Sequence, residues 1–160
     1  MYILDNEAIP PSTTPGQILP FTIGANGALQ SLVGGAVADD VTETDPIYLI
    51  LENKGKFVYV ANQNGADAST GAGIAGYTIN PSDSRLSQTP GSPWGTGAGP
   101  QCMLEDPSNQ FIYTANSTGN SVTGRLVDPV SGNLKALNYK TSEFPLQGPA
   151  SWCVATGRTN

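Results

Sequence analysis

The sequence predicts an all-β fold built from repeated four-stranded units, and three observations lead to this prediction. A strand–turn–strand unit at 100–116 recurs 54 residues earlier at 46–62. Nineteen glycines and thirteen prolines separate short runs of Val, Ile, Tyr and Phe, as in proteins with many tight turns. No segment has the 3.6-residue apolar period of an amphipathic helix. Four short strands in about 50 residues, repeated along the chain, are typical of β-propeller blades.

The first two strands of the unit repeat most clearly. The second strand reads Phe-Val-Tyr-Val-Ala-Asn at 57–62 and Phe-Ile-Tyr-Thr-Ala-Asn at 111–116, and a matching segment with Tyr2 occupies 1–5. First strands are expected at 46–50, 101–105 and 149–154. Third strands are expected at 18–23, 74–79 and 122–127, and short fourth strands at 28–33, 85–89 and 133–139. We therefore predict about three blades in one domain over 1–160, with repeats at approximately 1–55, 56–110 and 111–160. A β-sandwich is the alternative fold, but it does not require the same strand pair to recur in register.

The repeats resemble those of the lactonase-type seven-bladed propellers, the group with 6-phosphogluconolactonase-like and YVTN-type repeats. The resemblance rests on the two second strands, on Pro100 before the turn at Asp106-Pro107, and on Asp128-Pro129-x-Ser131-Gly132-x-Leu134. It implies the propeller fold and a possible lactone-hydrolysing activity. These motifs are turn and packing residues, so no catalytic residue of the family transfers onto this chain.

The chain is expected to begin at the second strand of one blade and to end at the first strand of another. The segment that would complete the last blade resembles 1–5, so we expect one copy to exchange strands with the next, giving a ring or a filament. The exchange would pair two segments, Met1, Tyr2, Ile3 and Leu4 with Trp152, Cys153 and Val154. The alternatives are a separate chain that carries the remaining blades, or a longer chain of which this is a part.

The main functional hypothesis is a non-catalytic propeller module for binding or self-assembly. One alternative is a lactonase-like hydrolase of the 6-phosphogluconolactonase type, present here as a partial or divergent chain. Another is a carbohydrate- or surface-binding module. The sequence has no histidine, so it supplies no Ser-His or Cys-His pair and no His metal site. Glu105 and Arg125 are available to assist lactone opening, but no motif in the sequence indicates that the two side chains lie close to each other. We therefore assign no catalytic residue and no cofactor.

Charge excludes one class of partner. The net charge is −6, and residues 1–53 hold seven acidic residues and no Lys or Arg. Without a basic patch to neutralise phosphates, nucleic acid is not an expected partner. No apolar run is long enough to span a membrane. The polar, Lys-poor composition is typical of secreted, periplasmic or cell-surface proteins, whose signal sequence would lie outside this chain.

Long connections of the blades would lie on one face, where binding residues usually occur. We expect a small carbohydrate or a cation as the possible ligand of this face. Its acidic candidates are Asp39, Asp40, Glu43 and Asp45, with Asn64 and Asp67 in a second loop beside Asn62. Their spacing matches no calcium loop, so a solvated acidic connection is the favoured interpretation and no metal site is assigned.

The remaining candidates are aromatic residues, asparagines and cysteines. Trp94 is the aromatic side chain expected on the loop face, whereas Trp152 is expected to pack within or between blades. Asn62 and Asn116 are expected to satisfy backbone groups where their strands end. Cys102 and Cys153 lie about one repeat apart, and we interpret them as buried free thiols, with a disulfide as the alternative.

Overall fold

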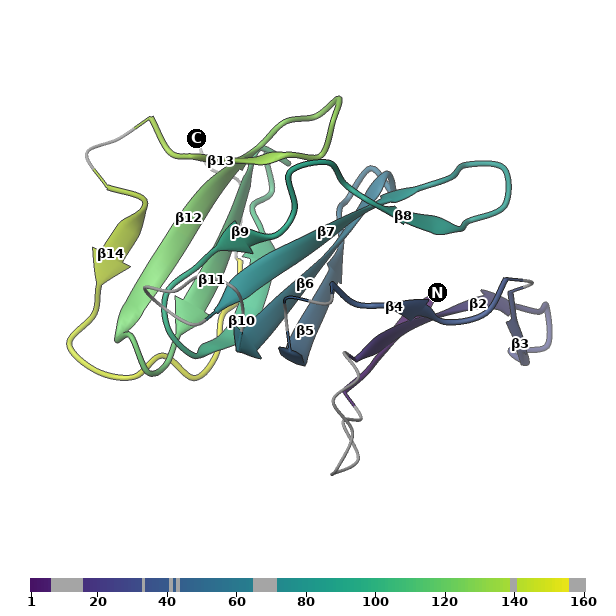
Figure 1. Cartoon of the computed structure of the whole chain (residues 1–160), viewed down its shortest axis with the longest axis horizontal. Helices are drawn as coiled ribbons and strands as arrows, with labels where there is room; N and C mark the ends of the chain where they lie inside the picture. Colours follow the sequence, from purple (N-terminus) through teal and green to yellow (C-terminus); the bar gives the residue numbers. More distant parts are fainter. Residues whose placement is uncertain are drawn as a thin grey trace.

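The computed structural model describes residues 1–6, 16–32, 34–40, 42, 44–64, 72–138 and 141–155. These residues form fourteen β-strands in three antiparallel sheets, which lie side by side (Figure 1). None of the described residues belongs to a helix that could cross a membrane.

The first sheet is centred on one strand, β2, which pairs with β1 on one side and with β3 and β4 on the other. Its strands are β1 (Tyr2–Asp5), β2 (Gln17–Ile23), β3 (Leu29–Ser31) and β4 (Val37–Ala38). Gly24 to Gly27 form the turn before β3, where Gly27 has a φ of 82°, as the sequence Asn-Gly predicts.

The second and third sheets share one topology, a four-stranded meander with a fifth short strand beside the third. The second sheet contains β5 (Thr44–Leu51), β6 (Phe57–Asn64), β7 (Gly73–Ile79), β8 (Leu86–Gln88) and β9 (Trp94–Gly95). The third contains β10 (Pro100–Glu105), β11 (Phe111–Asn116), β12 (Ser121–Val127), β13 (Leu134–Ala136) and β14 (Glu143–Pro145). The predicted first, second and third strands of these two sheets are confirmed.

The fourth strand of each blade differs from the prediction, because it is divided into two short pieces. In the second sheet β8 pairs with one end of β7, and β9 pairs with the other end at Gly73 and Ile74. Between the two pieces the chain leaves the sheet, and the Trp94 ring covers Gly76. A Cβ on Gly76 would stand 2.6 Å from that ring, so only glycine leaves room for the indole. β4, β9 and β14 therefore lie in segments for which no separate strand was predicted, between the expected fourth strand of one repeat and the expected first strand of the next.

The hydrophobic core lies between neighbouring sheets, and β6 contributes to both of its parts. Phe57, Tyr59 and Ala61 point toward the third sheet, whereas Val58 and Val60 point toward the first. All five side chains are buried. This strand therefore reads as a continuous apolar run, because both of its faces are covered.

The repeated tyrosine of the second strand joins each sheet to the next. The Tyr2 hydroxyl donates to the Ser84 carbonyl over 2.8 Å, and the Tyr59 hydroxyl donates to the Gly132 carbonyl over 2.8 Å. Ser84 and Gly132 occupy the same place in the turn after the third strand, with φ angles of 59° and 75°. At Gly132 a Cβ would approach the Phe57 ring to 2.5 Å, so this turn requires glycine there. The tyrosine and the turn motif thus form one contact between blades.

These features define a partial β-propeller of roughly three blades. The second and third sheets are complete blades, and the first sheet has the second, third and fourth strands of a blade. The inner strands β5 and β10 lie near each other, and β10 also lies beside the described C-terminal residues (Figure 1).

Candidate functional site

The main polar cluster lies in the first seam, which we define as the contact of Asp39 and Asp40 with Asn62, Tyr77 and Gln88. The two aspartates directly follow β4 and enter the space between the first and second sheets. Asp39 is 2% exposed and Asp40 is 9% exposed. The interpretation of these residues as a solvated acidic connection is therefore wrong. Their side chains are buried because the outer edge of the first blade turns inward against β6 and β7.

Each buried carboxylate is held by specific donors. Asp39 Oδ1 accepts hydrogen bonds from the Tyr77 hydroxyl and, over 2.9 Å, from the Asp40 amide. Asp40 Oδ1 accepts from the backbone amide and the hydroxyl of Thr42, over 2.8 and 2.6 Å, and Asp40 Oδ2 accepts from Gln88 Nε2. We did not predict Tyr77 or Gln88 from the sequence. The sequence does show that Tyr77 occupies the position in the third strand where the next repeat has Arg125, a large polar residue.

The electrostatics of the first seam favour a proton or a cation. Burial raises the pKa of Asp39, and the nearby Asp40 charge raises it further. The Tyr77 hydroxyl, the Asp40 amide and the Asn62 amide act in the opposite direction without cancelling the effect of burial. The pKa of Tyr77 is raised by burial and by the Asp39 charge, so the phenol keeps its proton and remains the donor.

Asn62 is the residue of the first seam whose bonding is incomplete. Its side chain is fully buried beside Asp39, and its two amide atoms have no hydrogen-bond partner among the described residues. Asp39 Oδ2 is in the same state within the described part of the chain. The Asn62 amide lies near enough to lower the pKa of Asp39, but without hydrogen-bond geometry.

The second seam, formed by Asn116 with Thr96, Ser121 and Thr123, is the equivalent contact between the second and third sheets. Asn116 Nδ2 donates to the Ser121 hydroxyl over 3.1 Å and to the Thr123 hydroxyl over 2.9 Å. Its Oδ1 accepts from the Thr96 hydroxyl over 3.3 Å. The prediction that Asn62 and Asn116 satisfy backbone groups is therefore wrong. Asn116 bonds side chains of two neighbouring blades, and the Asn62 amide bonds no described group.

The other acidic candidates do not join the first seam in the described structure. Asp45 lies in β5 with a φ of 60° and is half-buried. Glu43, Asp67 and the side chain of Asn64 lie outside the described residues. Within the described ranges, no three His, Cys, Asp or Glu side chains form a group that could hold a metal ion.

Trp94 lies in β9 rather than in an open loop. Its ring is half-buried, packs against Gly76 and lies 6.4 Å from the Tyr59 ring, measured between centroids. It borders the core cluster between the second and third sheets. This packing gives the Trp94 indole a structural role that does not require a bound ligand.

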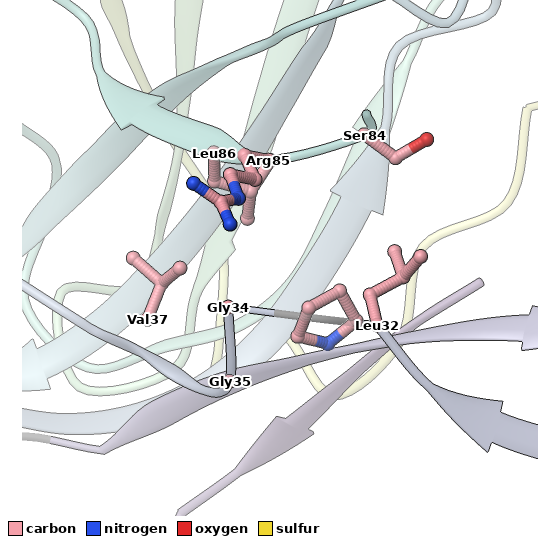
Figure 2. A pocket seen from close by; sticks show the side chains of 8 residues that line it. Leu32, Gly34, Gly35, Val37, Ser84, Arg85 and Leu86 are labelled. Carbon is pink, nitrogen blue, oxygen red and sulfur yellow. The ribbon is translucent and has the colours of Figure 1, made fainter. Parts of the chain in front are cut away.

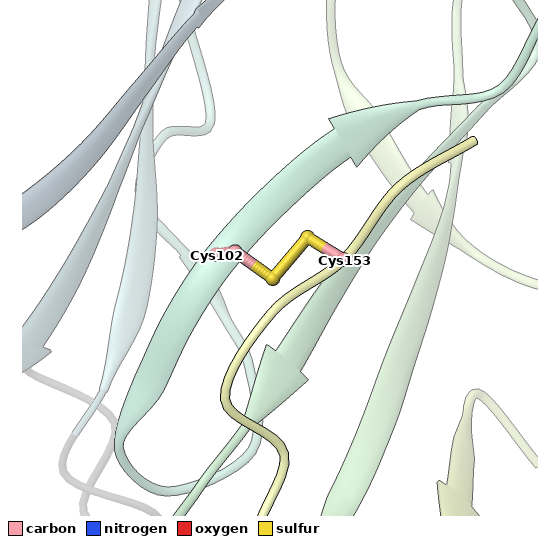
Figure 3. The surroundings of a disulfide bond; sticks show 2 residues. All are labelled: Cys102 and Cys153. Carbon is pink, nitrogen blue, oxygen red and sulfur yellow. A yellow bond between two sulfur atoms is a disulfide. The ribbon is translucent and has the colours of Figure 1, made fainter.

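Cys102 and Cys153 form a disulfide, so the interpretation of free thiols is wrong (Figure 3). Figure 3 shows the C-terminal segment running beside β10, to which the disulfide ties it. Residues 146–155 contain no strand, in contrast to the first strand predicted at 149–154. Trp152 is 87% exposed and Val154 is 80% exposed, so the expected packing of Trp152 is also wrong. The Cys102–Cys153 bond therefore attaches this segment to the inner strand.

The N-terminal strand has both buried and exposed residues. Tyr2 and Leu4 pack against the core between the first two sheets, whereas Met1 and Ile3 are exposed. Within the described residues β1 pairs with β2 alone. In the described structure β1 therefore has no second neighbouring strand, and the segment expected to pair with it, 149–154, forms no strand.

A small pocket of about 200 Å³ lies at the outer edge of the first two sheets (Figure 2). Pro20, Leu32, Val37 and Leu86 give it apolar walls. Figure 2 shows the Arg85 guanidinium above the turn at Gly34, and a Cβ on Gly34 would stand 2.9 Å from Arg85 Nε. Arg85 also forms a 3.6 Å ion pair with Asp83. The guanidinium thus packs on backbone between two blades.

Glu105 and Arg125 both lie across from Ile112 in the register of the third sheet, and each bonds a different group of the second sheet. Glu105 Oε2 accepts a hydrogen bond from the Asn53 amide over 2.7 Å, and Arg125 donates to the Gly95 carbonyl. Burial raises the pKa of Glu105, and the Asn53 amide lowers it less. Each side chain joins the third sheet to the second at a different level of the blade.

The comparisons with known proteins identify the same propeller fold that the structure shows. The profile of the family described as "Lactonase, 7-bladed beta-propeller" matches residues 11–154. The chain therefore belongs to the lactonase family of seven-bladed β-propellers, and the resemblance seen in the sequence is confirmed. No curated protein matches the chain.

Solved structures with the same fold come from several bacteria. A candidate 6-phosphogluconolactonase from Bacteroides uniformis is 19% identical with a TM-score of 0.69, over 86% of this chain and 37% of that one. A second candidate 6-phosphogluconolactonase, from Bacteroides fragilis, is 20% identical with a TM-score of 0.69, over 86% and 35%. A periplasmic gluconolactonase from Pseudomonas aeruginosa is 22% identical with a TM-score of 0.64, over 84% and 35%. The chain spans little more than a third of the length of these proteins.

Proposed function

We propose that this chain is part of a lactonase-type propeller that hydrolyses a sugar lactone of the gluconolactone class. The family match over residues 11–154, together with blades of the same architecture, is the observation that carries this proposal. Similar structures named as gluconolactonases support the substrate class. The hydrolase alternative is therefore favoured over the non-catalytic module.

Lactone opening requires attack of water on the ring carbonyl and a group that accepts a proton from that water. Two carboxylates in the described structure have a raised pKa, Asp39 and Glu105. Asp39 is 2% exposed in the first seam, too little for contact with a sugar lactone. Glu105 is partly exposed at the end of the inner strand β10, where its Oε2 accepts from the Asn53 amide and its Oε1 is buried without a partner among the described residues. Glu105 is therefore the base that we nominate.

The Glu105→Gln variant tests this assignment. We expect the chain to hydrolyse δ-gluconolactone faster than the spontaneous reaction, and the variant to lose about 100-fold in kcat. Because the base must be ionised, kcat/KM should fall as the pH drops through a value above the ordinary pKa of glutamate. The assay is acid release in a weakly buffered pH-stat, with Asp83→Asn, an exposed carboxylate, as the control.

A chain that gives only the spontaneous rate would contradict the proposal that these blades themselves carry the lactonase activity. Turnover that Glu105→Gln leaves unchanged, with an unchanged pH profile, would retain the activity but reject Glu105 as the base. The two results are distinguishable because the first concerns the wild-type chain and the second only the variant.

Strand exchange between copies stays a prediction. The exposed side chains of Trp152 and Val154 and the open edge of β1 support it. We expect light scattering on a size-exclusion column to give a multiple of the 16.6 kDa chain mass. Removal of residues 1–5 should then return the mass to one chain. A monomeric wild-type chain would reject the exchange.

An oxidising compartment is the location that we propose for the protein. The Cys102–Cys153 disulfide supports it, because such bonds persist in the periplasm and outside cells. The similar gluconolactonase from Pseudomonas aeruginosa is itself named as periplasmic.

A further inference from the structure

The first seam contains three buried polar atoms that the described residues leave without a hydrogen-bond partner. They are Asp39 Oδ2 and the two amide atoms of Asn62. Their side chains are 2% and 0% exposed, so bulk water does not reach them. Buried polar groups in folded proteins are nearly always paired, with protein, an ordered water or an ion. Three such atoms on two neighbouring side chains therefore form a candidate site for a polar or charged ligand.

The second seam shows what fills the same volume when the protein itself supplies the partners. In that seam, the residues across from Asn116 and Thr114 in the register are Ser121 and Thr123. Their two hydroxyls accept the hydrogens of the Asn116 amide.

In the first seam these hydroxyls are absent. The residues across from Asn62 and Val60 are Gly73 and Ala75, which have no polar side-chain atom. At the same time a carboxylate, Asp39, takes the place of the Thr96 hydroxyl directly after the outer strand. The two seams thus differ in a consistent way, since the first has lost hydroxyl groups and gained negative charge.

The charge of the first seam is not balanced by its hydrogen-bond donors. Asp39 and Asp40 accept from Tyr77, Gln88, Thr42 and a backbone amide, and all of these described donors are neutral. Burial of two adjacent carboxylates is unfavourable without a compensating positive charge.

We propose that the first seam binds an oxygen-preferring cation, for which Ca²⁺ is the probe, through Asp39 Oδ2 and Asn62 Oδ1. Ca²⁺ accepts carboxylate, amide-carbonyl, backbone and water oxygens, so two side-chain ligands leave the remaining positions to carbonyls and water. A water on the ion would accept the hydrogen of Asn62 Nδ2.

Such an ion would join the first blade to the second, because Asp39 follows β4 and Asn62 lies in β6. With one carboxylate as a direct ligand, the affinity should be in the range of weak extracellular sites, with half-saturation at about 0.1–1 mM. Binding to the folded chain alone should then raise the melting temperature by about 3–10 °C at 10 mM Ca²⁺.

The experiment uses the purified chain after EDTA treatment and exchange into buffer at pH 7.5. Ca²⁺ is titrated while the melting temperature is followed by circular dichroism and binding by calorimetry, with Mg²⁺ in parallel. The variants are Asp39→Asn and Asn62→Ala, and Asp83→Asn is the exposed control. Asp39→Asn should fold, because its amide oxygen still accepts from Tyr77 and the Asp40 amide.

We expect one Ca²⁺ per chain, a concentration-dependent rise in the melting temperature, and loss of both in Asp39→Asn and Asn62→Ala but not in Asp83→Asn. Failure of wild-type protein to bind Ca²⁺ by calorimetry would overturn the proposal, whatever the variants do. A shift of equal size in wild type and Asp39→Asn would also overturn it. If a proton on Asp39 balances the charge instead, Ca²⁺ leaves the melting temperature unchanged at pH 7.5, which is the same negative result.

Discussion

Replacing Cys102 and Cys153 together by serine should lower the free energy of unfolding by about 4 kcal/mol. The disulfide closes a loop across a sequence separation of 51 residues. In the chain-entropy model a loop of this length removes about 4 kcal/mol of conformational freedom from the unfolded state, and losses of about 2–5 kcal/mol are typical for small secreted domains. The measurement is urea unfolding of oxidised wild type and of the double variant, followed by circular dichroism.

Reduction of the wild-type protein with dithiothreitol should reproduce the effect of the double variant. It should also leave the blades intact, because Cys102 lies on β10 whereas the C-terminal segment forms no strand among the described residues. A double variant that unfolds at the same urea concentration as oxidised wild type would show that the bond adds no stability. Alanine at Met103, which is buried, provides a comparison for damage to the core itself.

The Asn116→Ala substitution should cost about 2–4 kcal/mol, the second large effect that we expect. Three side-chain hydrogen bonds are lost, while the hydroxyls of Thr96, Ser121 and Thr123 stay buried and keep their other partners, which are Thr114, Glu143 and the Gly97 amide. Each lost bond contributes about 1 kcal/mol, which gives the expected range. Equilibrium unfolding in urea measures the difference.

Asn62→Ala is the matched control for Asn116→Ala, because the two residues occupy the same place in neighbouring blades. In the presence of EDTA it should cost less than about 1 kcal/mol, since the Asn62 amide has no described hydrogen-bond partner to lose. Equal destabilisation by the two substitutions would mean that the two seams are bonded alike. It would contradict the difference between them on which the proposed cation site depends.

The strands and turns that recur in each repeat could be predicted from the sequence. The recurring sequence at 57–62 and 111–116, the repeated tyrosine and the Asp-Pro turn identified the strands, their order and the blade architecture. These patterns are local, because strand propensity and turn dihedrals depend on neighbouring residues. The repeat then determined which strands are equivalent. The contact between Tyr59 and Gly132 explains why the two motifs occur together, although the sequence alone did not link them.

Contacts between blades could not be predicted in the same way. Asp39 and Tyr77 are 38 residues apart and meet only because the chain beyond β4 turns under β6 and β7. Trp94 looked like a loop residue because the two-residue strand β9 is too short to show alternation. Cys102 and Cys153 have a spacing that fits either free thiols or a bond between neighbouring inner segments. In each case the decisive information is tertiary, since it depends on the packing of one sheet against another.

The divided outer strand has a consequence for how such proteins diverge. After β4 and β9 the chain delivers one polar residue, Asp39 or Thr96, into the blade that follows, while the sheet it leaves keeps its own pairing. A substitution at that position changes the chemistry of one junction and leaves the hydrogen-bond ladders of both sheets in place. Copies of a duplicated blade can therefore accumulate different chemistry at each junction, one at a time, without any intermediate that loses the architecture.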